Sequence, residues 1–575
     1  MKPITRYSLL FGLLACSALM TYAIDEDEEI DPYGPNCEDC ASTLFMLRPQ
    51  GLNSAAIFNP FYFGCCDSSL DTCWFFNVGY RFEQTFKADR IARCLFGAPT
   101  RTFVGHNALA NVQGSLDYVQ AENFGLSPNF IGSITFDPLI QNHNIDFLTR
   151  FEFGSVWNNL EGVYCMLNGT VTYSRWNLRA TQTVDADANT ITTMPACLNS
   201  VEPINAFPDI QTALSQTTSF GELPTGSAKY GRFVLNTPQT KTALANLDVI
   251  LGYDFLKCDG YHFGVFLKTV APTGNRPNPE TVFAPIVGNG HHWEFGGGAD
   301  GHWDIWSCDE QCVTAYIYGS ITHLFDDKQL RTFKLYNPKN QTSCCLSQYS
   351  LLKEFNNQEP PVFQNKLIRA TDYTTRRINS SFDVQGDATL RFVYRLSGWS
   401  FGIGYNVYGR SEEDIQMLDE TLTQPLDEKQ FGIKGDTGVC ASCVPPTGTS
   451  SVSLGATKFN TCVSDAIAMA NTPVDGDNPT PATGCAPGST AKTWYGTDAL
   501  TGDPKILEAD KNIHFKGVPR QITSKFFGHI DYQWQQCDFA PFIGIGGEAE
   551  FPFNGDCYVC TPSQWGIWVH GGMEF

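Results

Sequence analysis

The feature that most constrains this chain is a two-residue alternation of apolar and other side chains. In its last stretch, WGIWVHGGMEF, alternate positions are apolar or glycine: Trp565, Ile567, Val569, Gly571, Met573 and Phe575. Successive residues of a β-strand point to opposite faces, so this stretch predicts a strand with one apolar face. Soluble domains usually end in a frayed polar segment, and a terminal amphipathic strand is atypical of them.

The same alternation predicts strands along most of the chain. Many are about ten residues long, the length that crosses a bilayer when a strand is tilted. The segments are 74–86, 113–119, 130–136, 145–153, 163–175, 247–256, 260–271, 293–305, 312–324, 383–396, 398–410, 523–535, 539–551 and 563–575. We predict an all-β fold: a transmembrane antiparallel up-and-down β-barrel of about 14 strands (range about 12–18) with long extracellular loops. A soluble β-sandwich, which also alternates, is the competing fold.

The connections between these strands test the topology. If the C-terminus is periplasmic, the short links 536–538, 397, 306–311, 257–259 and 154–162 lie at the periplasmic end. The longer links then lie outside: 552–562, 272–292 and three large loops, 176–246, 325–382 and 411–522. Transmembrane barrels have short periplasmic turns and longer extracellular loops, so the alternation of link lengths supports the prediction.

The chain before the barrel has two predicted parts. Residues 1–23 resemble a signal peptide, with basic Lys2 and Arg6 followed by an apolar stretch, so we predict export. Cys16 lies in a stretch that also resembles a lipoprotein box. Residues 24–73 form an acidic, cysteine-rich periplasmic segment or plug, and the barrel occupies 74–575. After the signal, no stretch is long and apolar enough to predict a transmembrane helix.

The charge of the chain restricts its partners. The formal net charge is −22, which argues against nucleic-acid binding because that function needs a positive surface. A surface protein or a route for cations fits this charge better.

Cysteines are frequent, with 21 in the chain. In an exported protein such a number favours disulfides over zinc sites or a thioredoxin-like redox centre. The predicted disulfide cysteines are Cys37, Cys40, Cys65, Cys66, Cys73, Cys308, Cys312, Cys344, Cys345, Cys440, Cys443, Cys462, Cys485, Cys557 and Cys560.

With these features the chain resembles bacterial outer-membrane porins. More narrowly, it is similar to the cysteine-rich major outer membrane proteins of chlamydia-like intracellular bacteria. The stretches that carry the resemblance are NCEDCASTLFML, CWFFNVGYRFEQTFKADRIARCLFG and WGIWVHGGMEF. The resemblance implies passive diffusion of small polar solutes, an envelope stiffened by disulfides to neighbouring envelope proteins, contact with outer-membrane lipid, and a homotrimer.

The functional residues of a porin are the charges that face its lumen. Strand parity predicts as pore-lining Arg81, Arg150, Asp248, Asp254, Lys268, Glu294, Asp300, Asp304, Arg391, Arg395, Arg410, Asp531, Glu548 and Glu550. Two interpretations remain open: the charges form a transverse field across a constriction, or they pair with neighbours as in any aqueous lumen.

The remaining motifs do not predict catalysis. The stretch GNGHHWEFGGGADGHWD holds His291, His292 and His302, but His291 and His292 would point to opposite faces of a strand. The chain contains no GxSxG, HExxH or P-loop pattern. We expect no enzyme activity, no metal and no cofactor. The predicted function is an outer-membrane porin, and the alternative is a structural or adhesive surface barrel with a closed lumen.

Overall fold

The architecture was analysed in a computed structural model of the chain. The structure describes residues 46, 48–49, 53, 74–105, 108, 118–127, 129–185, 193–194, 204–219, 223–258, 260–308, 311–337, 342–343, 346–357, 363–418, 429–434, 507, 512–534, 539–553 and 561–574. The proposed signal peptide, the acidic run and Phe575 lie outside these residues.

Twelve strands form a closed antiparallel barrel. In order around the wall they are β1 (Trp74–Phe86), β5 (Leu139–Glu152), β6 (Val163–Asn177), β10 (Gln239–Cys258), β11 (Tyr261–Ala271), β12 (Glu294–Cys308), β13 (Gln311–Thr332), β18 (Thr375–Leu396), β19 (Trp399–Arg410), β23 (Gln521–Gln533), β24 (Ala540–Pro552) and β25 (Ser563–Glu574). The pairing of β1 with β25 joins the first and last strands of the wall, so the sheet has no free edge there. One further strand, β20 (Glu413–Met417), pairs with the part of β18 beyond its contact with β19.

Two of the fourteen predicted strands are not part of the barrel, so the predicted number was too high. The segment predicted at 130–136 is β4 (Ile131–Phe136), which pairs with β2 (Thr100–Val104) and β7 (Ala180–Val184). Only the last residues of the predicted 113–119 strand are described, in β3 (Tyr118–Gln120), which pairs with β2. At six and three residues these segments are too short to cross a bilayer, and their side chains instead complete a small sheet outside the barrel.

The alternation in the sequence corresponds to the two faces of the barrel wall. In β1 the exposed Phe76, Val78 and Tyr80 alternate with the buried Asn77, Gly79 and Arg81. In β25 the exposed Trp565, Ile567 and Val569 alternate with the buried Trp568 and His570. The exterior of the barrel therefore presents a band of large apolar side chains, and its interior carries most of the polar ones.

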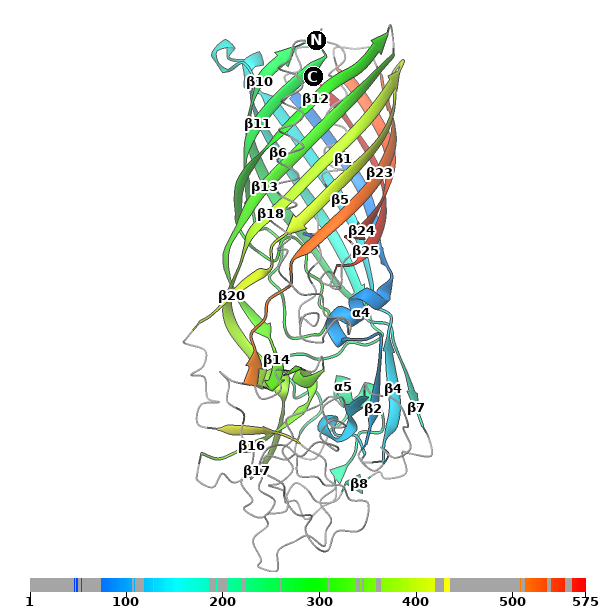
Figure 1. The fold of residues 1–575 in the computed structure, drawn as a ribbon, viewed down its shortest axis with the longest axis vertical. Helices are drawn as coiled ribbons and strands as arrows, with labels where there is room; N and C mark the ends of the chain where they lie inside the picture. Colours follow the sequence, from blue (N-terminus) through cyan, green and yellow to red (C-terminus); the bar gives the residue numbers. More distant parts are fainter. Residues whose placement is uncertain are drawn as a thin grey trace, which may run out of the picture.

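Connections at the two ends of the barrel differ in length, as the sequence predicted. At one end only short links join β10 to β11, β12 to β13 and β18 to β19. At the other end the four longest connections join β1 to β5, β6 to β10, β13 to β18 and β19 to β23. Figure 1 shows the barrel in the upper part of the molecule and the described helices and strands of the long connections below it.

The long connections fold together instead of remaining isolated loops. They contain the sheet β3-β2-β4-β7, a second sheet of β16 (Leu351–Phe355), β17 (Phe363–Arg369) and β21 (Gln430–Ile433), the small sheet of β14 (Lys334–Asn337), β15 (Thr342–Ser343) and β22 (Ile513–His514), and the pair β8 (Thr193–Met194) and β9 (Ile204–Asn205). The helices there are α4 (Ala88–Phe96), α5 (Ile210–Ser215) and α6 (Ala370–Thr374). Among the described residues, no helix is long and apolar enough to cross a membrane.

A large apolar core holds this outer part together. It joins side chains from links that are far apart in the sequence, including Phe96, Phe136, Phe233 and Tyr349. Phe96 stacks on Phe136 with ring centroids 4.0 Å apart, and Phe233 meets Tyr349 edge to face at 4.7 Å. Since four separate connections (87–138, 178–238, 272–293 and 333–374) contribute to one core, the outer part is a packed cap at one end of the barrel.

The buried Arg369 further ties these connections together. Its guanidinium donates hydrogen bonds to the backbone carbonyl of Tyr349, at 2.7 Å, and to that of Ala213. Burial lowers the pKa of Arg369 to about 9. The two carbonyls belong to different connections, so this side chain cross-links them.

Most of the predicted disulfide cysteines lie outside the described residues. Of the two described candidates, Cys308 and Cys312 carry thiols and do not form a disulfide. Cys165 and Cys258 are also thiols, whereas Cys94 in α4 is disulfide-bonded. Cys308 and Cys312 lie on the adjacent strands β12 and β13 near the same short link, and disulfides at the candidate cysteines remain a prediction.

Substitution of an outward residue tests the lipid-facing band. Ile403, in the middle of β19, is 70% exposed. We expect Ile403→Arg to lower the free energy of unfolding by about 2–4 kcal/mol in lipid vesicles, because a cation is costly at the middle of a bilayer. Urea unfolding followed by tryptophan fluorescence measures this.

The matched control is Thr181→Arg, at an exposed position of β7 outside the barrel, where the change should be within about 0.5 kcal/mol. Equal stability losses in the two variants would contradict a lipid-facing position for Ile403.

Candidate functional site

The predicted pore-lining residues all lie on barrel strands, on the face opposite the exposed apolar side chains. Twelve are buried, and Asp304 and Arg395 are half-buried: the buried ones are Arg81, Arg150, Asp248, Asp254, Lys268, Glu294, Asp300, Arg391, Arg410, Asp531, Glu548 and Glu550. This placement follows from strand parity, since each shares its face with other polar residues of the same strand. Their role in conduction remains a prediction.

Many of these charges are in contact with an opposite charge. Arg81 of β1 bonds Asp146 of β5 at 3.0 Å and Glu83, on its own strand, at 2.6 Å. Lys268 of β11 pairs with Asp248 of β10 at 2.9 Å. The geometry thus favours pairing between neighbours over two separated rows of opposite charge. On neighbouring strands these partners are diagonal, two residues from direct register, which is within reach of long side chains.

The charges are also shielded from solvent. Arg81, Lys525 and Asp531 are each only 1% exposed. In a wide aqueous pore, lumen charges would remain hydrated. Burial of this kind therefore indicates that the lumen is filled around them in this state, and buried charges of this kind are stable only when paired and hydrogen-bonded.

Part of the lumen is apolar, which the sequence analysis did not predict. A cluster of buried side chains on the inner face is formed by Phe75, Leu148, Tyr164, Met166, Ile250, Phe266, Tyr316, Tyr318, Val393 and Phe542. Phe75 stacks on Phe542 with centroids 5.6 Å apart, and Phe266 stacks on Tyr318 at 5.5 Å. The prediction of a polar lumen is thus right for most inner positions and wrong for this cluster.

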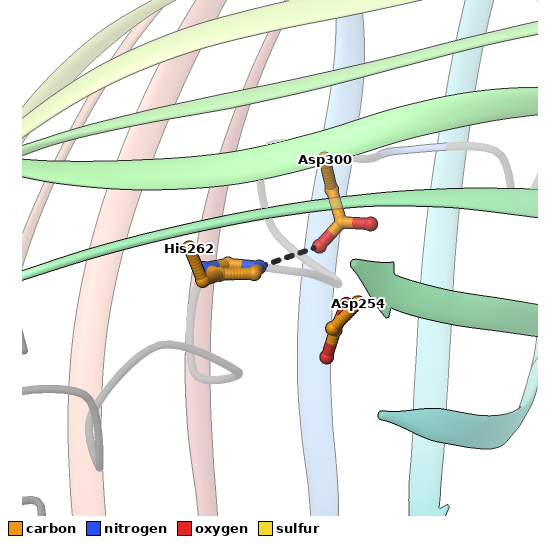
Figure 2. Close-up of side chains that lie close together, drawn as sticks. All are labelled: Asp254, His262 and Asp300. Carbon is orange, nitrogen blue, oxygen red and sulfur yellow. Dashed lines mark hydrogen bonds and ion pairs between the residues drawn. The ribbon is translucent and has the colours of Figure 1, made fainter. Parts of the chain in front are cut away.

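Two carboxylates and an imidazole converge on the inner wall near the short links. Asp254 of β10, His262 of β11 and Asp300 of β12 each offer a ligand atom within 4.8 Å of the others (Figure 2). His262 Nε2 lies 3.2 Å from Asp300 Oδ2, and Arg150 donates to Asp254 Oδ2 at 2.7 Å. The sequence analysis placed Asp254 and Asp300 on the lumen face but did not include His262.

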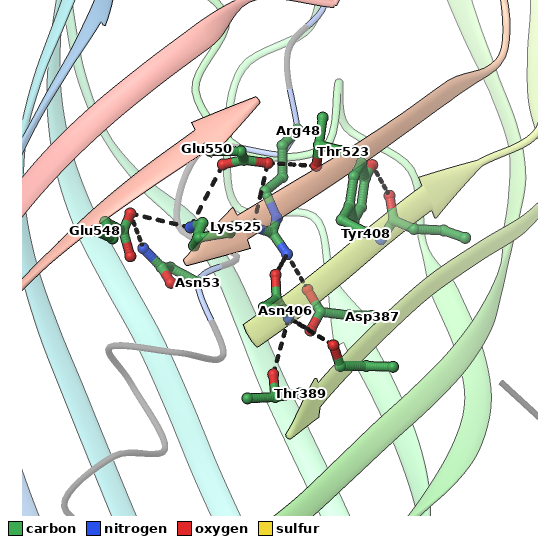
Figure 3. Close-up of polar contacts among 12 residues, drawn as sticks. Arg48, Asn53, Asp387, Thr389, Asn406, Tyr408, Thr523, Lys525, Glu548 and Glu550 are labelled. Atoms are coloured by element: carbon green, nitrogen blue, oxygen red, sulfur yellow. Dashed lines mark hydrogen bonds and ion pairs between the residues drawn. The ribbon is translucent and has the colours of Figure 1, made fainter. Parts of the chain in front are cut away.

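Residues of the N-terminal segment lie inside the barrel. The guanidinium of Arg48 donates to Asn406 at 2.7 Å and to Asp387, and lies 3.4 Å from Glu550 (Figure 3). It also stacks over the ring of Tyr408, 4.8 Å from the centroid. One side chain therefore bridges β18, β19 and β24 on one side of the inner wall.

Asn53 makes a second contact between the N-terminal segment and the wall. Its amide donates to Glu548 at 2.8 Å and to Glu83 at 3.2 Å. Lys525 lies beside them, 3.0 Å from Glu548 and 3.5 Å from Glu550. Figure 3 shows this network of contacts around Arg48 and Lys525. Arg48 and Asn53, from the predicted plug, thus bind acids of β1, β18 and β24.

Sequence reasoning missed several members of these clusters. Glu83 shares the parity of Arg81, and Lys525 shares that of Asp531, so strand parity alone would have found both. Arg48 and Asn53 gave no such signal, because they belong to no predicted strand.

The histidines of GNGHHWEFGGGADGHWD do not come together in one site. His292 bonds the carbonyl of Phe325 at 2.9 Å, His291 lies 3.5 Å from Asp327, and His302 lies further along β12. The flanking Trp293 and Trp303 are exposed on the outer face, as expected for an aromatic girdle. This stretch therefore leads into the barrel strand β12, and its three histidines do not share one site.

Comparisons with known proteins give only a general likeness. No family model and no curated protein sequence matches the chain. Among solved structures, it is similar to an outer-membrane channel of Pseudomonas putida F1, with 9% identity over 88% of this chain and 96% of that one and a TM-score of 0.32. A Pseudomonas aeruginosa FadL homologue has 8% identity over 92% and 99%, with a TM-score of 0.26. The β-domain of the Bordetella autotransporter BrkA has 7% identity over 88% and 100%, with a TM-score of 0.26. At these scores the likenesses carry no weight beyond the barrel that the strand pairing already shows.

The buried cation Lys525 offers a test of the lumen network. We expect Lys525→Met to lower the free energy of unfolding by about 3–5 kcal/mol, because Glu548 and Glu550 would lose a buried partner. Denaturant unfolding in detergent micelles at neutral pH measures the change.

Lys257→Met is the control, since Lys257 makes an exposed ion pair with Glu152 at 3.2 Å and its side chain is 64% exposed. This variant should lose at most about 1 kcal/mol. A loss for Lys525→Met no greater than for Lys257→Met would contradict a structural role for the lumen network.

Proposed function

We propose that this chain is a bacterial outer-membrane channel for small polar solutes or ions, and that Arg48 and Asn53 occlude its lumen in the present state. The observation that carries the proposal is a closed 12-stranded wall with large apolar side chains outside and charged side chains inside. A soluble protein would bury such apolar side chains against another layer.

The wall supports a membrane location. Backbone polar groups inside a bilayer need internal partners, and a closed barrel provides them for every strand. Ile403, Phe526 and Ile545 are among the most exposed apolar side chains of the wall, at 70%, 59% and 58%. An exposed apolar surface of this extent is stable against lipid and costly against water. Since spanning barrels of this type belong to the outer membrane, we infer that location.

The inner face supports a channel. Inward charges are unnecessary for a barrel that only has to fill its centre, because apolar side chains would do so without desolvating ions. Acidic residues such as Glu548 and Glu550 contact the N-terminal segment directly. Withdrawal of that segment would expose carboxylates to water, so we expect cations to be preferred over anions.

A structural or adhesive barrel with a closed lumen is the second candidate. The burial of the lumen charges favours it, as does the packed cap that the long connections form at one end. Under this alternative Arg48 and Asn53 are permanent parts of the core, as buried polar residues are in other proteins.

Several further expectations are part of the proposal, and the structure of the single chain does not test them. Disulfides to neighbouring envelope proteins, a homotrimer and the narrower likeness to cysteine-rich major outer membrane proteins follow from the sequence resemblance. The absence of enzyme activity also remains a proposal.

Planar-bilayer recordings of wild type and of the double variant Arg48→Ala/Asn53→Ala test the occlusion. The double variant removes the contacts to Asp387, Asn406, Glu550, Glu83 and Glu548. We expect rare or small conductance steps for wild type and frequent, larger, cation-selective steps for the double variant. Arg179→Ala is the control, because Arg179 pairs with Asp137 outside the barrel and should behave as wild type.

The possible results separate the candidates. No steps from either folded protein would favour the closed structural barrel. Equal steps from both would retain the channel and contradict occlusion by Arg48 and Asn53.

A further inference from the structure

We propose that Asp254, His262 and Asp300 form a binding site for one divalent transition-metal ion on the inner wall of the barrel. The site is separate from the contacts that Arg48 and Asn53 make, and it does not depend on whether the barrel conducts. The three side chains come from three successive strands and point toward one another in Figure 2.

The register of the sheet explains why these side chains meet. Gly264 of β11 lies directly opposite Asp254 of β10 on one side and Asp300 of β12 on the other. Two carboxylates therefore flank a residue that has no side chain. A Cβ at Gly264 would lie 2.3 Å from Asp254 Oδ1, so only glycine leaves space for this carboxylate.

A β-bulge also shapes the site. The pairing of β10 with β11 shifts between Asp254 and Leu256, and the consecutive residues Phe255 and Leu256 are both exposed. Bulges add an unpaired residue and change where the neighbouring side chains point. Here the bulge follows Asp254 immediately, and His262 lies on the partner strand next to it.

Unsatisfied polar atoms indicate a missing ligand. Asp254 is 8% exposed, and its Oδ1 has no hydrogen-bond partner among the described residues. His302, also 8% exposed, lies opposite His262, and its Nε2 likewise has no partner there. Buried acceptors without a donor are costly, and such atoms in a native structure call for an unseen water or ion.

The hydrogen bonds around His262 determine which ring nitrogens of His262 and His302 carry a hydrogen. If His262 Nε2–H donates to Asp300, the Nδ1 of His262 accepts a hydrogen bond from the Nδ1–H of His302, which faces it. The Nε2 of His302 then keeps an unused lone pair. A metal ion on His262 would replace its bond to Asp300 and give both carboxylates a cation.

The charge balance favours a cation. Asp254 and Asp300 are both buried, and the guanidinium of Arg150 binds Asp254. Arg150 also contacts Glu152 at 3.2 Å and stacks over Tyr164, so its charge is shared. Asp300 has the neutral donor Tyr164, at 3.0 Å, and His262. The arginine that contacts this pair of buried carboxylates is thus shared with Glu152, and a divalent ion would add positive charge beside both.

The donor atoms select the class of ion. Imidazole nitrogen combined with carboxylate oxygen suits Zn²⁺, Mn²⁺, Fe²⁺ or Co²⁺, whereas Ca²⁺ and Mg²⁺ prefer oxygen ligands alone. Metal–ligand bonds of about 2.0–2.2 Å would require the three side chains to close slightly around the ion.

Metal binding to the full chain, purified in detergent and treated with EDTA, provides the test. We expect Zn²⁺ titration followed by calorimetry to give one ion per chain, and Co²⁺ to give a visible absorption band that Zn²⁺ abolishes. His262→Gln and Asp300→Asn should each weaken Zn²⁺ binding by at least about tenfold and remove the Co²⁺ band.

His323→Gln and Asp137→Asn are the matched controls, since both residues are exposed and lie away from the site. They should bind Zn²⁺ as wild type does. The electrophoretic mobility of unheated samples, which distinguishes folded from unfolded barrels, verifies that each variant is folded. Absence of stoichiometric binding to folded wild type, or binding unchanged in His262→Gln and Asp300→Asn, would overturn the proposal.

Discussion

The structure depends on closing one sheet so that its backbone hydrogen bonds have no free edge within the wall. Two pairings complete the closure: β1 with β25, which joins residues almost 500 positions apart, and β13 with β18, which flank a long connection. Once the wall is closed, every inward residue must share the interior with residues from distant strands. The lumen contacts and the cap follow from that arrangement.

Charges inside such a wall need partners because water is excluded from them. The wall supplies many partners itself, as between Lys268 and Asp248. The wall supplies too few positive partners near β23 and β24, where the two carboxylates of Glu548 and Glu550 share Lys525. Arg48 and Asn53 complete that region from the N-terminal segment. The N-terminal segment therefore contributes partners for the buried acids of the barrel, in addition to its proposed occlusion of the lumen.

The inner wall near the short links is organised differently. There an aromatic cluster containing Phe266 and Tyr318 borders the converging Asp254, His262 and Asp300. Apolar surroundings strengthen electrostatic interactions, so a cation would strongly stabilise a pair of carboxylates in this position. The same barrel thus combines a region where Arg48 and Lys525 contact Glu550 with one where Arg150 is shared between Asp254 and Glu152.

The sequence alone determined which side chains point outward or inward and that short and long links alternate along the chain. Alternation with a period of two is a local property, and Tyr80 and Arg81 must point to opposite sides in any strand that contains both. The strands at 113–119 and 130–136 were misassigned because a short alternating segment looks the same in a barrel as in a small outer sheet. Tertiary structure decided the register of the strand pairs, and hence that Gly264 separates Asp254 from Asp300. It also decided that Arg48 reaches Asp387, 339 positions away. Contacts of this range depend on register and closure, which no local pattern encodes.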